Sequence, residues 1–213
     1  MWFGAGKTHC FLHCFELRFI MQTRGIRSKD AAAALGGRVI FCFCCIGAVA
    51  SSMAAEKMER QSMQLVSTAF ALGESIPALH TCTGKNISPA LKWSGVPEGA
   101  KSLALIADDP DAPVGTWVHW VLYDLPPATK ELPEDLPKSQ YIPGGGAQGL
   151  NDFKHLGYGG PCPPPGKPHR YFFKLYALDT MLELKPGATK KAVEKAMETH
   201  VLAQGELMGT YKR

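Results

Sequence analysis

Three short apolar segments dominate the hydrophobic pattern of the second half of the chain. They are Ser102–Ala107 (SLALIA), Trp117–Leu125 (WVHWVLYDL) and Arg170–Leu178 (RYFFKLYAL). Each is apolar at nearly every position, which is typical of strands buried on both faces. From Leu65 onward, Gly and Pro punctuate the chain at roughly eight- to twelve-residue intervals, the spacing of a mostly β fold. We therefore predict a mostly β domain in which these three segments are central strands of a sandwich.

One segment near the C-terminus has helical periodicity. Thr189 is a good N-cap residue and Gly205 a natural stop, so we predict a helix over Thr189–Ala203. Glu206–Tyr211 is expected to return as a terminal strand. The predicted helix gathers apolar residues at three- and four-residue spacing on one face, namely Ala192, Val193, Ala196, Met197, His200 and Val201.

The region between the second and third apolar segments, residues 126–168, is rich in Gly and Pro and shows no periodicity. It contains Pro143 followed by three glycines, and the segment Gly157–Gly166 (GYGGPCPPPG). So long a stretch without periodicity is usually functional loop or disorder. Because it leads directly into the third apolar strand, we predict ordered loops packed over the sheet.

Residues 1–54 differ from the rest and are interpreted as a targeting segment or a mis-assigned N-terminal extension, with the domain spanning residues 55–213. The segment carries six basic and two acidic residues, and Val39–Ala50 is a strongly apolar run. The length of this run and its small residues before Ser51 are typical of a secretory signal, which predicts export to the periplasm or outside the cell. The alternatives are an organelle transit peptide, or a true start near Met58 or Met63 and a cytoplasmic protein.

Charge and motifs exclude several classes of protein. From residue 55 onward, 17 basic residues are balanced by 17 acidic ones, so the domain lacks the positive surface that nucleic-acid binding requires. No apolar run reaches the roughly 18 residues of a membrane span. From residue 55 onward there is no Walker loop, Gly-x-Ser-x-Gly elbow or paired Cys-x-x-Cys metal site. We expect no cofactor and no metal site.

Polar chemistry gathers beside the first two apolar segments. The motif Asp109-Pro110-Asp111 follows the first segment, and its proline fixes the backbone so that both carboxylates can point to one side of the strand end. His119 lies inside the second segment. Each has an ordinary structural explanation, a turn for the motif and a hydrogen-bonded core residue for the histidine.

The third apolar segment opens on a histidine, an arginine and a tyrosine. Strand alternation sends His169 and Tyr171 to one face and Arg170 to the other. Imidazole, phenol and backbone N–H groups at three strand ends offer the donors that an oxyanion such as phosphate requires. The residues alone therefore predict a candidate anion or polar-ligand site.

Several segments, in order, resemble the signature of the phosphatidylethanolamine-binding protein (PEBP) family. The likeness covers about Met63–Arg213 and is greatest to the YbhB/YbcL branch, often named Raf kinase inhibitor-like. It implies a β-sandwich of a large and a small antiparallel-type sheet with a C-terminal helix. The segments are Asn86–Pro89, Leu91–Trp93, Asp109–Pro113, Trp117–Trp120, Gln148–Phe153, Gly157–Pro161 and Gly166–Tyr171.

The resemblance also implies a pocket for phosphate-like head groups. His119 and Tyr171 are the expected direct anion donors. Asp109 would orient an imidazole or accept from a ligand ammonium, Pro164 would form a wall, and Arg170 would be structural. The implied ligand-binding residues are Asp109, Asp111, His119, Pro164, His169 and Tyr171.

Two cysteines lie in the domain, Cys82 and Cys162. If the protein is exported, they are a candidate disulfide that would tie the Asn86 loop to the proline-rich loop. Such a bridge would close about 80 residues, worth about 4 kcal/mol on the chain-entropy model. The alternative is two unrelated small residues in loops.

The leading interpretation is a protein that binds a phosphate-type small molecule or a phospholipid head group and modulates a kinase or another protein partner. We do not expect an enzyme, because no motif places a nucleophile beside a base. One alternative is a hydrolase or metal-dependent enzyme that uses the aspartates and histidines of the pocket. Another is a protein inhibitor that acts through the loops of residues 128–168.

Overall fold

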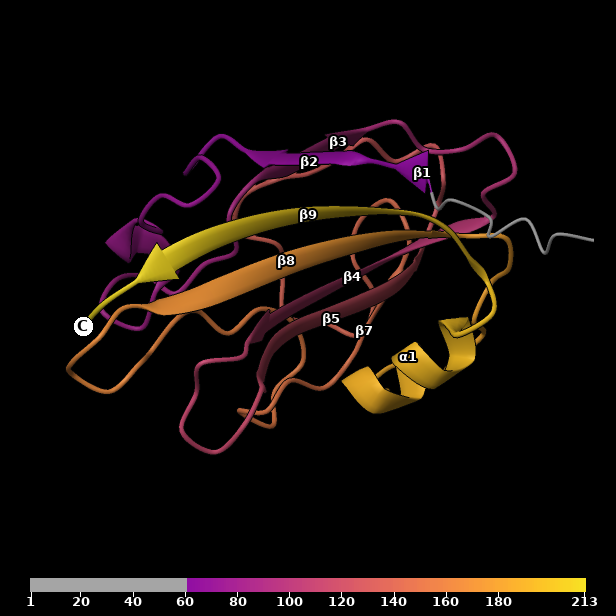
Figure 1. Ribbon diagram of the computed structural model, residues 1–213. Helices are drawn as coiled ribbons and strands as arrows, with labels where there is room; N and C mark the ends of the chain where they lie inside the picture. Colours follow the sequence, from indigo (N-terminus) through magenta and orange to yellow (C-terminus); the bar gives the residue numbers. More distant parts are fainter. Residues whose placement is uncertain (1–60) are drawn as a thin grey trace, which may run out of the picture. The chain divides into compact units, whose positions relative to one another are not determined.

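The computed structural model describes residues 61–213 (Figure 1). The predictions made for residues 1–54, including the signal segment, lie outside the described residues. The elements, in chain order, are β1 (Gln61–Ser62), β2 (Gln64–Ser67), the 3-10 helix η1 (Ala78–His80), β3 (Leu91–Ser94), β4 (Ser102–Asp109), β5 (Trp117–Leu125), β6 (Glu131–Leu132), β7 (Ala147–Gln148), β8 (His169–Leu178), α1 (Lys190–Met197) and β9 (Val201–Tyr211).

The strands form two sheets of unequal size. The larger has the order β1-β9-β8-β4-β5-β7 and the smaller the order β2-β3-β6. Neighbouring strands are antiparallel, except that β1 runs parallel to β9. In Figure 1 the small sheet lies on one side of the large sheet and α1 on the other. The predicted mostly β sandwich with a late helix is confirmed.

The three apolar segments are the central strands of the large sheet, as predicted. β4 lies between β8 and β5, and all eight of its residues are buried. Leu103 and Leu105 pack in the core between the two sheets, whereas Ala104 and Ile106 pack on the opposite face in a second core that includes Val193 of α1. Because both faces are covered, the strands show no polar alternation.

The C-terminal helix is shorter than its periodicity predicted. α1 ends at Met197, and Val201 begins β9, so His200 and Val201 do not lie on the helix face. The start was predicted correctly, since Thr189 caps the helix by accepting from the Ala192 N–H at 3.3 Å. β9 takes the downstream residues because it pairs with β8 along its length and buries alternate side chains. Tertiary pairing of this kind outweighs the weak stability of one further helical turn.

Gly205, expected to stop the helix, instead lies inside β9. A Cβ atom at this position would stand 2.7 Å from the carbonyl oxygen of Met63. The Met63 N–H donates to the Gln204 carbonyl at 2.8 Å, which holds the chain between β1 and β2 against β9. A glycine is therefore needed at this point so that the two backbones can approach.

Substitution Gly205→Ala should lower the free energy of unfolding by about 1–3 kcal/mol, the usual cost of forcing extra volume into a packed site. Gly99→Ala is the matched control, because a Cβ at Gly99 would stand 3.7 Å from its nearest neighbour, the Leu202 Cδ1 atom. The control should be neutral or stabilising by up to about 1 kcal/mol. Urea unfolding measures both, and equal stabilities of the two variants would contradict the packing account.

Candidate functional site

A cavity of about 230 Å³ lies where the C-terminal end of β4 meets the N-terminal ends of β5 and β8. Its polar lining consists of Asp109, Trp117, His119 and His169. The rest of the lining is apolar apart from Cys162, and consists of Ala112, Pro113, Val114, Phe153, Pro163 and Pro164. A few polar groups in a mostly apolar lining are the usual make-up of a small-molecule site.

His119 reaches this cavity because β5 contains a β-bulge. Ala107 of β4 is paired with Trp120, whereas the next residue, Asp108, is paired with Val118, so His119 is the extra residue. Regular alternation would send His119 and Trp120 to opposite faces of the sheet. With the bulge, Trp120 enters the core between the sheets, and His119 packs against Tyr171 of that same core.

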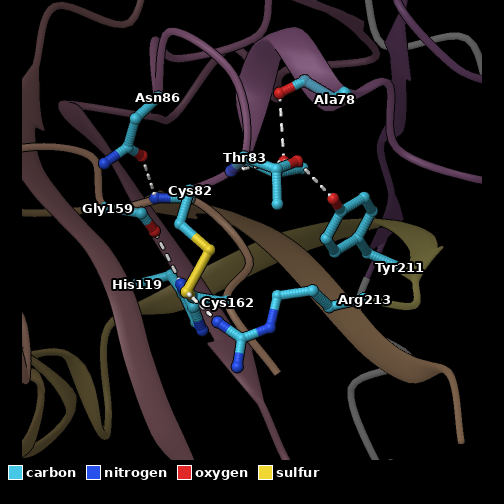
Figure 2. Close-up of a disulfide and its surroundings, with 11 residues drawn as sticks. Ala78, Cys82, Thr83, Asn86, His119, Gly159, Cys162, Tyr211 and Arg213 are labelled. Atoms are coloured by element: carbon cyan, nitrogen blue, oxygen red, sulfur yellow. Dashed lines mark hydrogen bonds between the residues drawn. A yellow bond between two sulfur atoms is a disulfide. The ribbon is translucent and has the colours of Figure 1, made fainter. Parts of the chain in front are cut away.

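A hydrogen bond fixes the ring of His119. Its Nδ1 atom lies 2.6 Å from the carbonyl oxygen of Gly159, as Figure 2 shows. Since a carbonyl oxygen can only accept, Nδ1 carries the proton and Nε2 carries a lone pair in the neutral ring. Burial of the side chain, which is 4% exposed, lowers the pKa of His119, although the Gly159 carbonyl and the Asp109 carboxylate act in the opposite direction.

The second histidine of the cavity is oriented by a buried carboxylate. Asp109 Oδ2 accepts from His169 Nδ1 at 2.8 Å, and both side chains are buried. Asp109 Oδ1 accepts from the Asp111 N–H at 2.8 Å. The carboxylate of Asp109 therefore fixes the orientation of the His169 imidazole.

Two polar atoms near the cavity have no hydrogen-bond partner of ordinary geometry among the described residues. They are the indole Nε1 of Trp117, which lines the cavity, and the hydroxyl of Tyr171. The Tyr171 ring packs edge-on against His119 with 5.2 Å between ring centroids, and Tyr171 is not part of the lining. Burial, together with the nearby Asp109 carboxylate, raises the pKa of the Tyr171 phenol. Buried polar atoms without a partner are uncommon and call for a ligand or an ordered water.

The sequence predicted that both carboxylates of the Asp-Pro-Asp motif point to one side of the strand end. This prediction is wrong. Asp111 does not line the cavity but forms a two-pronged ion pair with Arg170, at 2.7 and 2.9 Å. Arg170 thereby lowers the pKa of Asp111 to about 2. The separation arises because the Asp111 N–H folds back onto Asp109, which turns the second carboxylate toward the outer face of β8. Arg170 does not line the cavity.

Sequence reasoning missed several residues of the lining. Trp117 could have been found, because it lies two residues before His119 on the same strand. Phe153 could not, since it comes from a loop without periodicity, and its ring lies edge-on to those of both Trp117 and His119. Pro164 lines the cavity together with its neighbour Pro163.

The structure joins Cys82 and Cys162 in a disulfide, with 5.3 Å between their Cα atoms. The Cys82 N–H donates to the Pro161 carbonyl at 3.0 Å, and the Gly160 N–H donates to Asn86 Oδ1 at 2.6 Å. The bridge therefore ties the loop that follows η1 to the loop that carries the His119 partner (Figure 2).

Comparison with known proteins identifies the family. The family model described as phosphatidylethanolamine-binding protein matches residues 66–212. The chain belongs to the PEBP family. A UPF0098 protein of Methanothermobacter thermautotrophicus is 55% identical over 151 residues, which cover 71% of this chain and 99% of that protein.

Two solved structures of PEBP relatives share the fold. The PEBP homologue CT736 of Chlamydia trachomatis has a TM-score of 0.66 and 44% identity, covering 72% of this chain and 99% of its own. YbcL of Escherichia coli, described as a member of the mammalian PEBP family, has a TM-score of 0.67 and 37% identity, covering 71% and 99%. The resemblance seen in the sequence is thereby confirmed, and it extends over the whole length of these PEBP relatives.

Among residues 61–213, no group of three or more His, Cys, Asp or Glu side chains is arranged to hold a metal ion. In the same range no helix is long and apolar enough to cross a membrane.

The imidazole of His119 should titrate below the ordinary histidine value of about 6.5 in the ligand-free protein, because burial disfavours its charged form. In the unfolded chain it titrates at the ordinary value. As pH falls, the unfolded state therefore takes up the proton before the folded state does. The stability that His119 contributes is complete above about pH 6.5 and is lost as pH falls below that value.

An NMR pH titration of the histidine resonances measures this midpoint, with His119 assigned by its absence from the spectrum of His119→Gln. The same variant should lose less stability than the wild type between about pH 7 and pH 5, measured by urea unfolding. A midpoint at or above 6.5 would contradict burial as the dominant influence on the pKa of this ring.

Proposed function

We propose that this PEBP-family protein binds a small phosphate-type anion in the cavity at the ends of β4, β5 and β8. The observation that carries the proposal is a pair of imidazoles in the cavity lining, His119 and His169, each held through Nδ1 by a hydrogen bond to the protein. Each ring therefore keeps Nε2 for a ligand. An anion that accepts from the protonated rings gains charge-assisted hydrogen bonds.

His119 couples this binding to a proton. With Nδ1 committed to Gly159, only Nε2 of this ring is left for a ligand. The neutral ring can accept at Nε2 from a ligand O–H, and the protonated ring donates from Nε2 to an anion. A fully deprotonated anion such as sulfate therefore binds with uptake of a proton by His119.

The apolar part of the lining defines the other half of the ligand. Val114 at the cavity is 77% exposed, and the proline-rich wall, defined as residues 163–168, contributes Pro163 and Pro164. The cavity is smaller than the roughly 300–1,000 Å³ of drug-sized pockets. A phosphate monoester or a phospholipid head group fits this arrangement, with the phosphate at the histidines and the organic group at the apolar lip.

Binding is preferred to turnover because the cavity offers no Ser, Thr or free Cys as a nucleophile. Its lining, within residues 61–213, contains no Ser or Thr hydroxyl, and the sulfur of Cys162 is held in a disulfide. Covalent catalysis needs an activated nucleophile beside a base. The hydrolase alternative, modulation of a kinase or other partner, and inhibition through loops 128–168 stay predictions.

We propose that the protein is exported to the periplasm or outside the cell. The sequence of Val39–Ala50 resembles a secretory signal, and disulfides such as Cys82–Cys162 form and persist in oxidising compartments.

Phosphate and phosphoethanolamine should each raise the midpoint of thermal unfolding of the full chain. A ligand that binds only the folded state stabilises it by RT ln(1 + [L]/Kd), about 1.4 kcal/mol at ten times Kd. For a domain of this size that is a shift of about 3–6 °C. Differential scanning fluorimetry measures the shift.

The shift should vanish in His119→Ala and persist in His200→Ala. His200 is the matched control, because it pairs with Asp179 at the surface and does not line the cavity. Circular dichroism checks that both variants are folded. No shift in the wild type at millimolar ligand, or an equal shift in folded His119→Ala, would overturn the proposed site.

A further inference from the structure

The proline-rich wall of the cavity has few polar attachments, although Pro163 is buried. Among the described residues, none of those from 163 to 168 takes part in a hydrogen bond or an ion pair. The wall is held at one end by His169, the first residue of β8, and at the other by Cys162. The Cys82–Cys162 disulfide is therefore the last fixed point of the chain before the wall.

The loop that precedes the wall is held independently of the sulfur atoms. The Tyr158 hydroxyl donates to the His80 carbonyl at 2.8 Å, and the Gly160 N–H donates to Asn86 at 2.6 Å. The Cys82 N–H adds a third contact to the Pro161 carbonyl. Breaking the disulfide therefore leaves the Gly159 carbonyl in place beside His119 and releases mainly the wall.

The disulfide is open to chemical attack. Cys82 is exposed and Cys162 is half-buried. The guanidinium of Arg213 lies 3.6 Å from the sulfur of Cys162, as Figure 2 shows. A neighbouring cation stabilises a thiolate, and a more stable thiolate is a better leaving group in thiol–disulfide exchange. Exposed disulfides are the ones that are labile or regulatory.

We propose that the Cys82–Cys162 disulfide is a redox switch of the anion cavity, in which the oxidised form binds the ligand and the reduced form binds it weakly. The proposal rests on the proposed function, since it concerns the same cavity. It joins three observations: the bridge lines the cavity through Cys162, anchors the wall, and lies open to solvent beside Arg213.

The reductant is a dithiol, either a small molecule or a reductase protein with two cysteines. One of its thiolates attacks Sγ of Cys82, the S–S bond breaks, and Cys162 leaves as a thiolate beside Arg213. The second thiolate of the reductant then attacks the mixed disulfide, which frees Cys82 as a thiolate. Two electrons pass from the dithiol to the protein, both protein thiolates take up protons, and the reductant becomes a disulfide.

The test compares phosphate affinity of the full chain before and after treatment with dithiothreitol. Binding is read from NMR resonances of the folded protein, so that a change in the folded fraction does not enter the Kd. Reduction should weaken phosphate binding about ten-fold, because an unanchored wall must be ordered again on binding. The double variant Cys82→Ala/Cys162→Ala should match the reduced protein and should not respond to dithiothreitol.

Arg213→Gln separates the switch from a merely structural bridge. It should leave the phosphate Kd of the oxidised protein unchanged and slow reduction by dithiothreitol several-fold, measured by thiol release. Equal affinities of the oxidised and reduced folded forms would overturn the switch alone. An unchanged reduction rate in Arg213→Gln would overturn the assigned direction of attack. Failure of the oxidised wild type to bind phosphate would contradict the proposed function itself.

Discussion

The hydrogen bond from His119 to the Gly159 carbonyl is the constraint on which the candidate site depends. It joins a bulge in a central strand to a glycine-rich loop 40 residues away. The loop can approach this closely only because it carries glycines: a Cβ at Gly159 would stand 2.6 Å from the Phe153 ring, and one at Gly160 would stand 2.2 Å from the His80 carbonyl. The bond also places a proton on Nδ1 of His119. Nε2 therefore accepts a hydrogen bond in the neutral ring and donates one in the protonated ring.

Neighbouring carboxylates at the end of β4 show how the sheet separates structure from function. Asp108 points to the face that carries α1, where it is buried between the ammonium groups of Lys174 and Lys190 and holds the helix to the sheet. Asp109 points to the opposite face and orients His169. One face of the strand end is thus committed to stability, and the other is left for chemistry at the cavity.

Much of this arrangement could be predicted from the sequence. The strands β5 (Trp117–Leu125) and β8 (His169–Leu178) follow from runs of apolar residues that only a sheet covered on both faces can bury. The predicted helix was too long because the same apolar spacing continues into β9, and local periodicity does not reveal strand pairing. The bulge at His119 and the turn of Asp111 toward Arg170 depend on contacts between segments distant in the chain, which single-strand alternation cannot show.

The most direct test of the account is the protonation of His119 when an anion is bound. Sulfate carries no proton near neutral pH, so its binding at Nε2 requires the imidazolium form. The ¹⁵N shifts of the His119 ring, recorded at about pH 7 with saturating sulfate, should show both nitrogens protonated, whereas the free protein should show a proton on Nδ1 alone. Saturating sulfate that leaves Nε2 unprotonated would place the anion elsewhere and contradict the account.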